Sequence, residues 1–484
     1  MKALKRVALV TLIASASALW GAADPGVTFI GRGEIPGNSL DKSGLFGNIC
    51  QKDVPTNCIH KAIFGGMGSA LTYTGYDKVF LAVPDRGPFD GRTDVPYLDR
   101  FHFLYMNVDT SKNPNTNVLN IDWNLLDTRF LKHEVDWNFV GASSAFLPFE
   151  PNNLFMTLRL DPEGVVVSRD GTFFVSDEYG PFLFEFNRRG RLIRRIPLPP
   201  KFLITHPSGE VDSAGNSWEL YPVGSPALPA GILGNNSGRQ ANRGMEGLAI
   251  TPNGRYLVGL MQNALIQDNG LNNSVPPGRV GLNNRIFRYD LWTRQSAEYV
   301  YTLDAISQGK GANEILAIND HEFLVLERDN RSLVSPGADA FSPAASGLKR
   351  IYKIDLNGAT DVSGFDSLVG QTFIPVTKTL FLDLLNPAYE VDISTTPHKT
   401  IKNIIAEKIE GLAWGPKLPD GRLLLYVMSD NDLNTGFPTQ IYAFAIDANS
   451  AGLTFVRQDT PVPLYPFERF KRVRDRWDDF WDRD

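Results

Sequence analysis

A hairpin pattern recurs along the chain, and its clearest copy spans residues 161–179. That copy reads Asp-Pro-Glu-Gly, an apolar run, a turn at Asp170-Gly171, a second apolar run and then Ser-Asp-Glu-Tyr. Two runs of β-branched and aromatic residues joined by Asp-Gly predict a tight antiparallel hairpin. Because the first strand of a hairpin starts beside the end of the second, the acidic residues at both ends are expected to meet at one edge.

Four more segments follow the same plan, closely at 242–263 and 408–432 and more loosely at 65–88 and 313–331. A hairpin cannot bury both of its faces alone, so repeated units with further strands between them predict one large β-propeller. In the second unit, residues 182–186 and 192–197 supply the third and fourth strands of a complete blade.

The number of blades is less clearly marked than the fold. Five hairpins are recognisable, and a sixth blade has candidate sequence in the degenerate regions 109–158 and 357–405. We therefore expect an all-β fold of six blades, with five as the alternative. The last blade is expected to contain strands at 440–446 and 453–457, and residues 27–31 are expected to pair with it and seal the ring.

The N-terminus is typical of a secretory signal peptide, with basic residues, an apolar run at 7–19 and small residues before Asp24. We expect cleavage after Ala23; a retained anchor is disfavoured because the run is short for a bilayer. No later stretch approaches spanning length, so the mature chain is expected to lack a transmembrane segment and to be extracellular, or periplasmic in a bacterium. The expected domains are the signal peptide (1–23), a propeller with loop insertions (24–465) and a charged amphipathic tail forming a short helix (466–484).

Charge and cysteine content narrow the choice of partners. The whole chain has a formal charge of −6, and removing the signal peptide removes only cations, which argues against nucleic acid as a partner. Cys50 and Cys58 are the only cysteines, and in a secreted protein they predict a disulfide. The six histidines show no zinc-type spacing. The oligomeric state is not predicted.

Carboxylates at the strand ends are expected to ring one mouth of the propeller channel. So many carboxylates repel one another unless they are neutralised. Oxygen donors without histidine or thiolate suit Ca²⁺, with Mg²⁺ and Mn²⁺ as less favoured alternatives. The predicted metal ligands are Glu163, Asp177, Glu246, Glu314, Glu410 and Asp430.

Arginines occupy the same strand ends, and their forked guanidinium groups suit phosphate or carboxylate. The predicted ligands of a small anionic substrate are Arg86, Arg243, Arg328 and Tyr179. Glu178 and Arg159 flank the clearest hairpin and are the predicted catalytic pair. Arg159 would recognise an anionic oxygen, and Glu178 would hold metal or orient the attacking water. The alternative is a purely structural network of ion pairs between blades.

Several of these motifs resemble the phytase-like family, which is described as having esterase-like activity of phytase. They are Gly-Gly-Met-Gly-Ser-Ala-Leu at 65–71, Asp-Arg-Gly-Pro at 85–88, Asp-Pro-Glu-Gly at 161–164, Ser-Asp-Glu-Tyr-Gly-Pro at 176–181, Asn-Arg-Gly-Met-Glu-Gly at 242–247 and Lys-Ile-Glu-Gly-Leu at 408–412. The resemblance covers nearly the whole mature chain, and it implies a secreted β-propeller that hydrolyses phosphoesters or other esters. The first unit has Gly-Ser where later units have Glu-Gly.

Three functions remain open on the sequence: a calcium-assisted phosphoester hydrolase, a metal-dependent hydrolase of carboxylic esters or lactones, and a non-catalytic extracellular binding propeller. The first is favoured. Serine-esterase, Walker and His-Glu-x-x-His motifs are absent from the sequence, which disfavours those chemistries.

Overall fold

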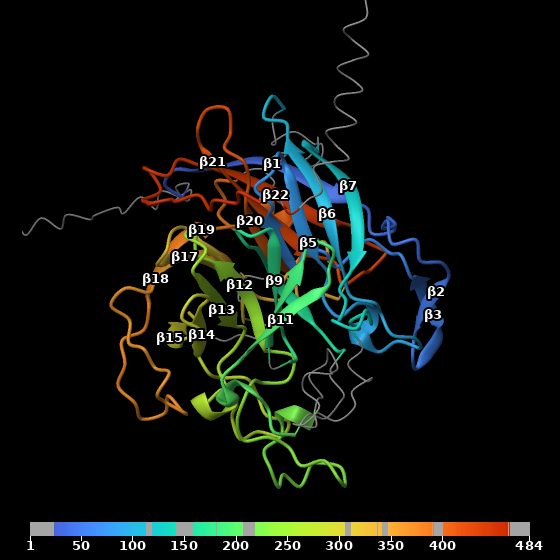
Figure 1. Cartoon of the computed structure of the whole chain (residues 1–484), viewed down its shortest axis with the longest axis vertical. Helices are drawn as coiled ribbons and strands as arrows, with labels where there is room; N and C mark the ends of the chain where they lie inside the picture. The colour runs from blue at the N-terminus through green and yellow to red at the C-terminus, as the bar shows by residue number, and fades with distance from the viewer. Residues whose placement is uncertain are drawn as a thin grey trace, which may run out of the picture.

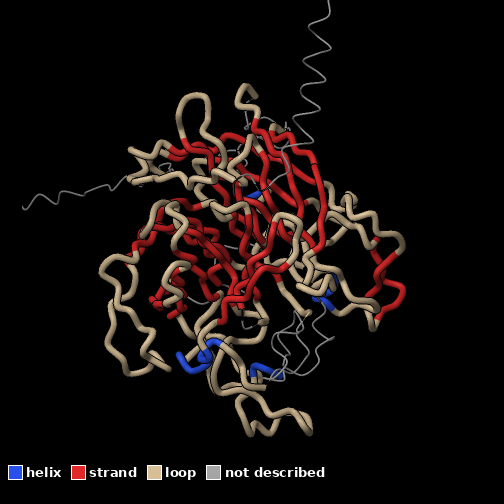
Figure 2. Tube along the Cα trace, in the orientation of Figure 1, coloured by secondary structure: helices blue, strands red, loops and turns tan. Residues whose placement is uncertain are grey.

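The computed structural model describes residues 24–112, 119–141, 158–180, 182–206, 218–304, 311–335, 337–340, 347–389, 391, 400–462 and 464. In these residues the chain forms five four-stranded antiparallel sheets, arranged as the blades of a propeller (Figure 1). Strands are far more abundant than helical segments, which are few and short, and long loops connect the strands (Figure 2). The all-β propeller predicted from the hairpin repeats is confirmed.

Four of the blades are built from consecutive strands in chain order, and the fifth combines the last three strands with the first. Blade one contains β4 (Ala70–Tyr73), β5 (Val79–Val83), β6 (Arg100–Val108) and β7 (Ile121–Phe130). Blade two contains β8 (Pro162–Val167), β9 (Thr172–Asp177), β10 (Phe182–Asn187) and β11 (Leu192–Pro197). Blade three contains β12 (Met245–Ile250), β13 (Tyr256–Met261), β14 (Asn283–Asp290) and β15 (Ser296–Thr302). Blade four contains β16 (Gly311–Ala317), β17 (Glu322–Arg328), β18 (Lys349–Asp355) and β19 (Thr377–Asp383). Blade five contains β20 (Lys408–Trp414), β21 (Leu423–Asp430), β22 (Thr439–Ile446) and β1 (Val27–Ile35).

Short 3₁₀ segments interrupt the connections between strands. They are η1 (Pro88–Gly91), η4 (Pro200–Phe202), η5 (Trp218–Leu220), η6 (Ile266–Asp268) and η7 (Ile401–Asn403). No helix in the described part of the chain has the length and apolar character that crossing a bilayer requires. The predicted signal peptide and the predicted helix of the tail lie outside the described residues.

The ring has five blades, the alternative to the six that the sequence favoured. The described residues of the two degenerate regions form no blade of their own, because β7 and β19 lie within these regions and serve as the fourth strands of blades one and four. The N-terminal strand β1 completes blade five by pairing with β22, from Val27 opposite Ile446 to Ile35 opposite Thr439. That closure confirms the predicted pairing, whereas residues 453–457 form no strand.

Apolar side chains fill the space between neighbouring blades, and the five largest clusters each join two adjacent blades. The inner strands β4, β8, β12, β16 and β20 contact one another in sequence around the axis. They approach closely: a Cβ on Gly247 of β12 would lie 2.7 Å from the backbone nitrogen of Ile315 on β16. Both faces of these strands are therefore buried, which explains their continuous apolar runs.

The segment 452–464 crosses one end of the channel. Val456 donates its backbone N–H to Ile318, Gln458 donates its side-chain amide to the carbonyl of Val167, and Leu464 is fully buried between blades one and two. A cavity of about 70 Å³ lies there among the described residues, lined by this segment and the last residues of the inner strands. The open mouth is consequently at the other end.

A separate hairpin, β2 (Asn48–Gln51) and β3 (Val54–His60), stands beside the ring at the right of Figure 1. A disulfide joins Cys50 to Cys58 across it, as the sequence predicted. Its residues Asn57 and Ile59 reach the wall of the open mouth.

Candidate active site

A cavity of about 610 Å³ occupies the open mouth of the channel. Its wall combines the first residues of inner strands, the residues that follow the second strands, and connecting loops. Most of the predicted site residues meet here: Arg86, Glu163, Glu178, Arg243, Glu246, Arg328, Glu410 and Asp430. The described wall includes no histidine or cysteine.

A bulge at the same place in four inner strands positions the acidic side chains. The register shifts between Pro162 and Val165 on β8, and corresponding shifts occur at the start of β12, β16 and β20. A bulge leaves one residue outside the ladder and re-aims its side chain. The residues at these bulges are Glu163, Glu246, Asn313 and Glu410.

The register corrects the sequence alignment of blade four. Asn313 takes the position of the glutamates, and Glu314 takes the position that glycine holds in the Glu-Gly units. The Glu314 Oε1 atom accepts hydrogen bonds from the backbone N–H groups of Ile315 (2.8 Å) and Leu248 (3.2 Å). Glu314 thus links blades three and four by hydrogen bonds and does not line the cavity.

Three other predicted site residues lie behind the wall. Asp177 Oδ1 accepts hydrogen bonds from the backbone N–H groups of Asp161 (3.0 Å) and Tyr179 (3.1 Å), so it organises the turn that presents Glu178. The guanidinium carbon of Arg159 lies 3.9 Å from the centre of the Tyr179 ring. Neither Arg159 nor Tyr179 lines the cavity, so the structure brings Glu178 to the site without its predicted partner.

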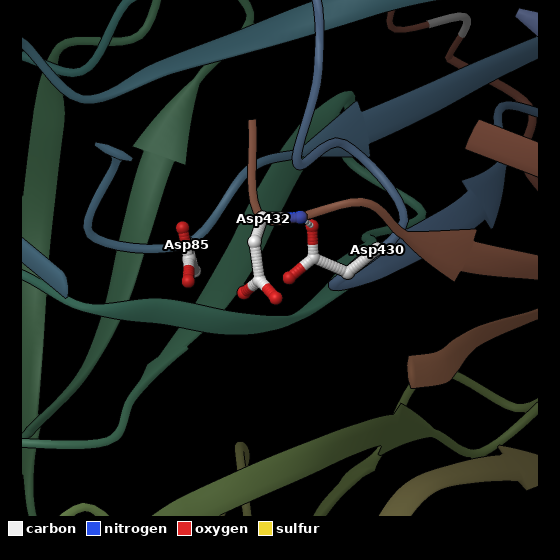
Figure 3. Close-up of side chains that lie close together, drawn as sticks. All are labelled: Asp85, Asp430 and Asp432. Atoms are coloured by element: carbon white, nitrogen blue, oxygen red, sulfur yellow. Dashed lines mark hydrogen bonds between the residues drawn. The ribbon is translucent and has the colours of Figure 1, made fainter. Parts of the chain in front are cut away.

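Two compact groups of carboxylates lie at the cavity, and all of their members except Asp161 line its wall. Asp85, Asp430 and Asp432 come from the ends of β5 and β21 and lie side by side in Figure 3. Asp161, Glu163 and Glu178 form the second group. In each group one oxygen from every residue lies within 4.8 Å of the others. Asp85, Asp161 and Asp432 are not among the metal ligands predicted from the sequence, although Asp85 and Asp432 belong to the strand-end carboxylates that were expected at the mouth.

Two of the three predicted substrate arginines are paired with buried carboxylates. Arg86 places one guanidinium nitrogen 3.2 Å from Asp161 Oδ2 and 3.7 Å from Glu178 Oε2. Arg328 lies 2.5 Å from Glu410 Oε1. Ion pairing at these distances fixes the carboxylates in place and reduces the positive charge that Arg86 and Arg328 can offer to a substrate.

The carboxylates outnumber the nearby cations, and burial strongly affects their ionisation. Burial, followed by the charge of Glu246, holds the pKa of Glu163 well above its usual range. Burial, followed by the charges of Glu178 and Glu410, does the same to the pKa of Glu246. Burial raises the pKa of Asp85 to about 7 against the opposing effect of Arg86. Added positive charge would therefore favour the ionised forms of these groups.

Several acceptor oxygens at the site have no donor in the described part of the chain. Glu246 Oε1 accepts hydrogen bonds from the side-chain amides of Gln262 (2.5 Å) and Asn313 (2.9 Å), which fixes the orientation of both amides. The remaining oxygens, Glu246 Oε2, Gln262 Oε1 and Asn313 Oδ1, are buried without a partner in these residues, and so is Glu178 Oε1. Buried acceptors of this kind require a donor or a cation. This donor set fits a hard divalent cation.

Left-handed backbone conformations also gather at the cavity. Phe89, Asp90, Asn242, Asp432 and Leu433 all line it and have φ between 49° and 57°. Such conformations are unfavourable for residues other than glycine, most of all for a bulky residue such as Phe89. They concentrate where a loop must present specific groups to a ligand.

Comparisons with known proteins identify a family for most of the chain. A family model described as phytase-like, esterase-like activity of phytase, matches residues 62–433. An uncharacterized secreted protein from Arthroderma benhamiae is 27% identical over 352 residues, which are 63% of this chain and 63% of that protein. The chain therefore spans less than two thirds of the length of that relative.

Solved structures provide more remote likenesses. A protein of unknown function from Dyadobacter fermentans is 12% identical with a TM-score of 0.32, over 87% of this chain and 100% of that one. A structural genomics protein of unknown function from Bacteroides thetaiotaomicron is 11% identical with a TM-score of 0.27, over 87% of this chain and 76% of that one. TM-scores of this size do not establish a shared fold.

Proposed function

The chain belongs to the phytase-like family, and from that premise we propose that it is a secreted hydrolase of ester bonds, with phosphoesters as the favoured substrates and a divalent cation at the channel mouth. One observation carries the proposal. Buried oxygens without a donor in the described residues, on Glu178 and Glu246, stand in a cavity that contains an excess of carboxylates.

The cation is proposed to be Ca²⁺, because the available donors are carboxylate and amide oxygens. Glu163 and Glu246 would hold it, and Asp85, Asp430 and Asp432 form a separate group of oxygens that would offer a second position. When bound, a divalent cation would polarise an ester oxygen and stabilise the negative charge that develops on it.

The protein's own groups have separate roles in this proposal. Glu178 Oε1, which is buried without a partner in the described chain, accepts a proton from the attacking water. Arg86 holds Glu178 and Asp161 in position. Arg243 lines the cavity and offers its guanidinium group to an anionic oxygen of the substrate.

A carboxylic ester or lactone is the second candidate substrate. It is favoured by the pairing of Arg86 with Asp161 and of Arg328 with Glu410, which leaves less positive charge available than a phosphate dianion would use.

The test is a panel of phosphomonoesters, carboxylic esters and lactones, assayed with purified protein in calcium and in chelator. Calcium-dependent phosphate release that Glu178→Gln abolishes would support the first proposal. Acid release without phosphate would favour the second. Glu185→Gln is the matched control, because Glu185 lies on β10 of the same blade and pairs with Arg194 away from the cavity. Absence of turnover with every substrate and metal would refute a hydrolase.

A further inference from the structure

Arg279 lies beside the cavity on a loop between β13 and β14. The loop is closed by a β-bridge between Leu271 and Arg279 and by the backbone hydrogen bond from Val280 to Gly270 (2.9 Å). The Arg279 guanidinium donates to the carbonyl of Ala241 at 3.0 Å. This contact brings Arg279 against the short segment that leads to Arg243, which lines the cavity.

Arg243 and Arg279 differ from the other cations at the cavity. Arg86 pairs with Asp161, Arg328 pairs with Glu410, and Lys408 pairs with Asp432. Within the described ranges, no carboxylate forms an ion pair with either Arg243 or Arg279, and both guanidinium groups donate to backbone carbonyls.

The positive charges of the two arginines oppose each other, and no ion pair within the described residues neutralises either one. Burial, followed by the charge of Arg243, lowers the pKa of Arg279 to about 9. The Arg279 Nε–H group is buried and has no acceptor among the residues that the structure describes. A buried donor and two neighbouring like charges are both stabilised by an oxyanion.

The position of the pair in the ring is also informative. Arg243 immediately precedes β12 of blade three, whereas Asp85, Asp430 and Asp432 end strands of blades one and five. In a closed ring of five blades, blade three lies across the channel from the junction of blades five and one. Arg243 therefore lies across the cavity from the group Asp85, Asp430 and Asp432, on the side where Glu178 and Glu246 are the carboxylates whose charges act on it.

We propose that Arg243 and Arg279 together form a receptor for a compact oxyanion, and that this receptor binds the anionic group of the substrate. The inference rests on the proposed hydrolase and deepens it, because it assigns the anion to blade three and adds a residue from an insertion loop. The ester would lie between this receptor and the carboxylates of blades one and five.

Calorimetric titration with inorganic phosphate and with acetate, in chelator, tests the receptor without requiring turnover. We expect saturable binding to the unmodified protein, and dissociation constants at least tenfold weaker for Arg243→Gln and Arg279→Gln. Arg422→Gln is the control, because Arg422 pairs with Asp420 on the turn between β20 and β21 and should bind as the unmodified protein does. Tighter binding of phosphate identifies a phosphoester group, and tighter binding of acetate identifies a carboxylate.

If Arg279→Gln does not fold, Arg279→Lys provides the test. Lysine retains the positive charge but lacks the forked guanidinium group that donates two hydrogen bonds to an oxyanion. We expect Arg279→Lys to bind phosphate more weakly than the unmodified protein. Undiminished affinity in the Arg279 variants, or no saturable binding of either anion, would overturn the receptor. Binding without any turnover would instead leave the receptor standing and refute the hydrolase. If the protein turns over substrate but the variants bind the anions as tightly as the unmodified protein, the hydrolase stands and the receptor is refuted.

Discussion

Replacing Gly247 by alanine tests how closely the inner strands must approach. Its added Cβ would lie 2.7 Å from the nitrogen of Ile315 and 2.9 Å from the Cα of Glu314, and both contacts are with backbone that cannot rotate away. Gly411 holds the equivalent position on β20, but there the nearest atoms are the Gly68 oxygen at 3.1 Å and the Leu71 Cβ at 3.3 Å. The same substitution therefore meets two different environments in one motif.

The expected magnitudes follow from two opposing effects. Overpacking a filled core costs about 1–3 kcal/mol. Replacing glycine where the backbone is compatible with alanine stabilises by about 0.4–1 kcal/mol through the unfolded chain. We expect Gly247→Ala to lower the free energy of unfolding by about 1–2 kcal/mol, and Gly411→Ala to change it by less than about 1 kcal/mol.

Urea unfolding followed by tryptophan fluorescence would measure both variants against the unmodified protein. The midpoint for Gly247→Ala should fall while the dependence on urea stays unchanged, because the area exposed on unfolding is the same. Equal midpoints for the two alanine variants would refute the argument from close approach.

The remaining predictions concern the cavity. Burial raises the pKa of Asp85 to about 7 and the pKa of Asp161 to about 6. The folded protein therefore holds these two protons more tightly than the unfolded chain does. In the absence of a cation, the melting temperature should fall as the pH rises from about 4 to 7. Calcium should raise the melting temperature more at pH 7.5 than at pH 5, and a cation-free melting temperature that rises over this window would contradict the assignment. Glu178→Gln should abolish turnover while the protein stays folded, and full activity in that variant would exclude its catalytic role. Arg159→Lys should lower the melting temperature through lost stacking on Tyr179 and leave turnover within about twofold, because Arg159 lies behind the wall; a large loss of turnover at an unchanged melting temperature would place it in the mechanism.

The sequence predicted the first two strands of every blade because their signals are local. Apolar runs and tight turns mark each hairpin, and acidic residues from the ends of several hairpins line one cavity. The outer strands carry a weaker signal. In β19 most residues are at least partly exposed, and only Phe381 and Leu382 are buried. Such strands are hard to tell from loops, and for that reason the two regions suggested a sixth blade.

The candidate site was predictable to the level of motifs and not of single residues. A bulge shifts the register by one residue in β16, so the residue at the position of the cavity glutamates is Asn313. The sequence pattern instead predicted Glu314, the nearest glutamate, as a metal ligand. Arg279 has no motif at all, because it is positioned by a loop that folds back on blade three. The pairing of Arg86 with Asp161 depends on the meeting of blades one and two, which sequence spacing cannot predict.

Closure of blade five by β1 has a consequence for biosynthesis. β1 is the first strand of the ring to be made, and its partner β22 is the last. Because synthesis proceeds from the N-terminus, β1 stays without its partner until nearly the whole chain has emerged. An unpaired strand edge invites association with other chains. Completion of the ring is thus tied to completion of synthesis, and a prematurely terminated chain would keep its first strand open to aggregation or proteolysis.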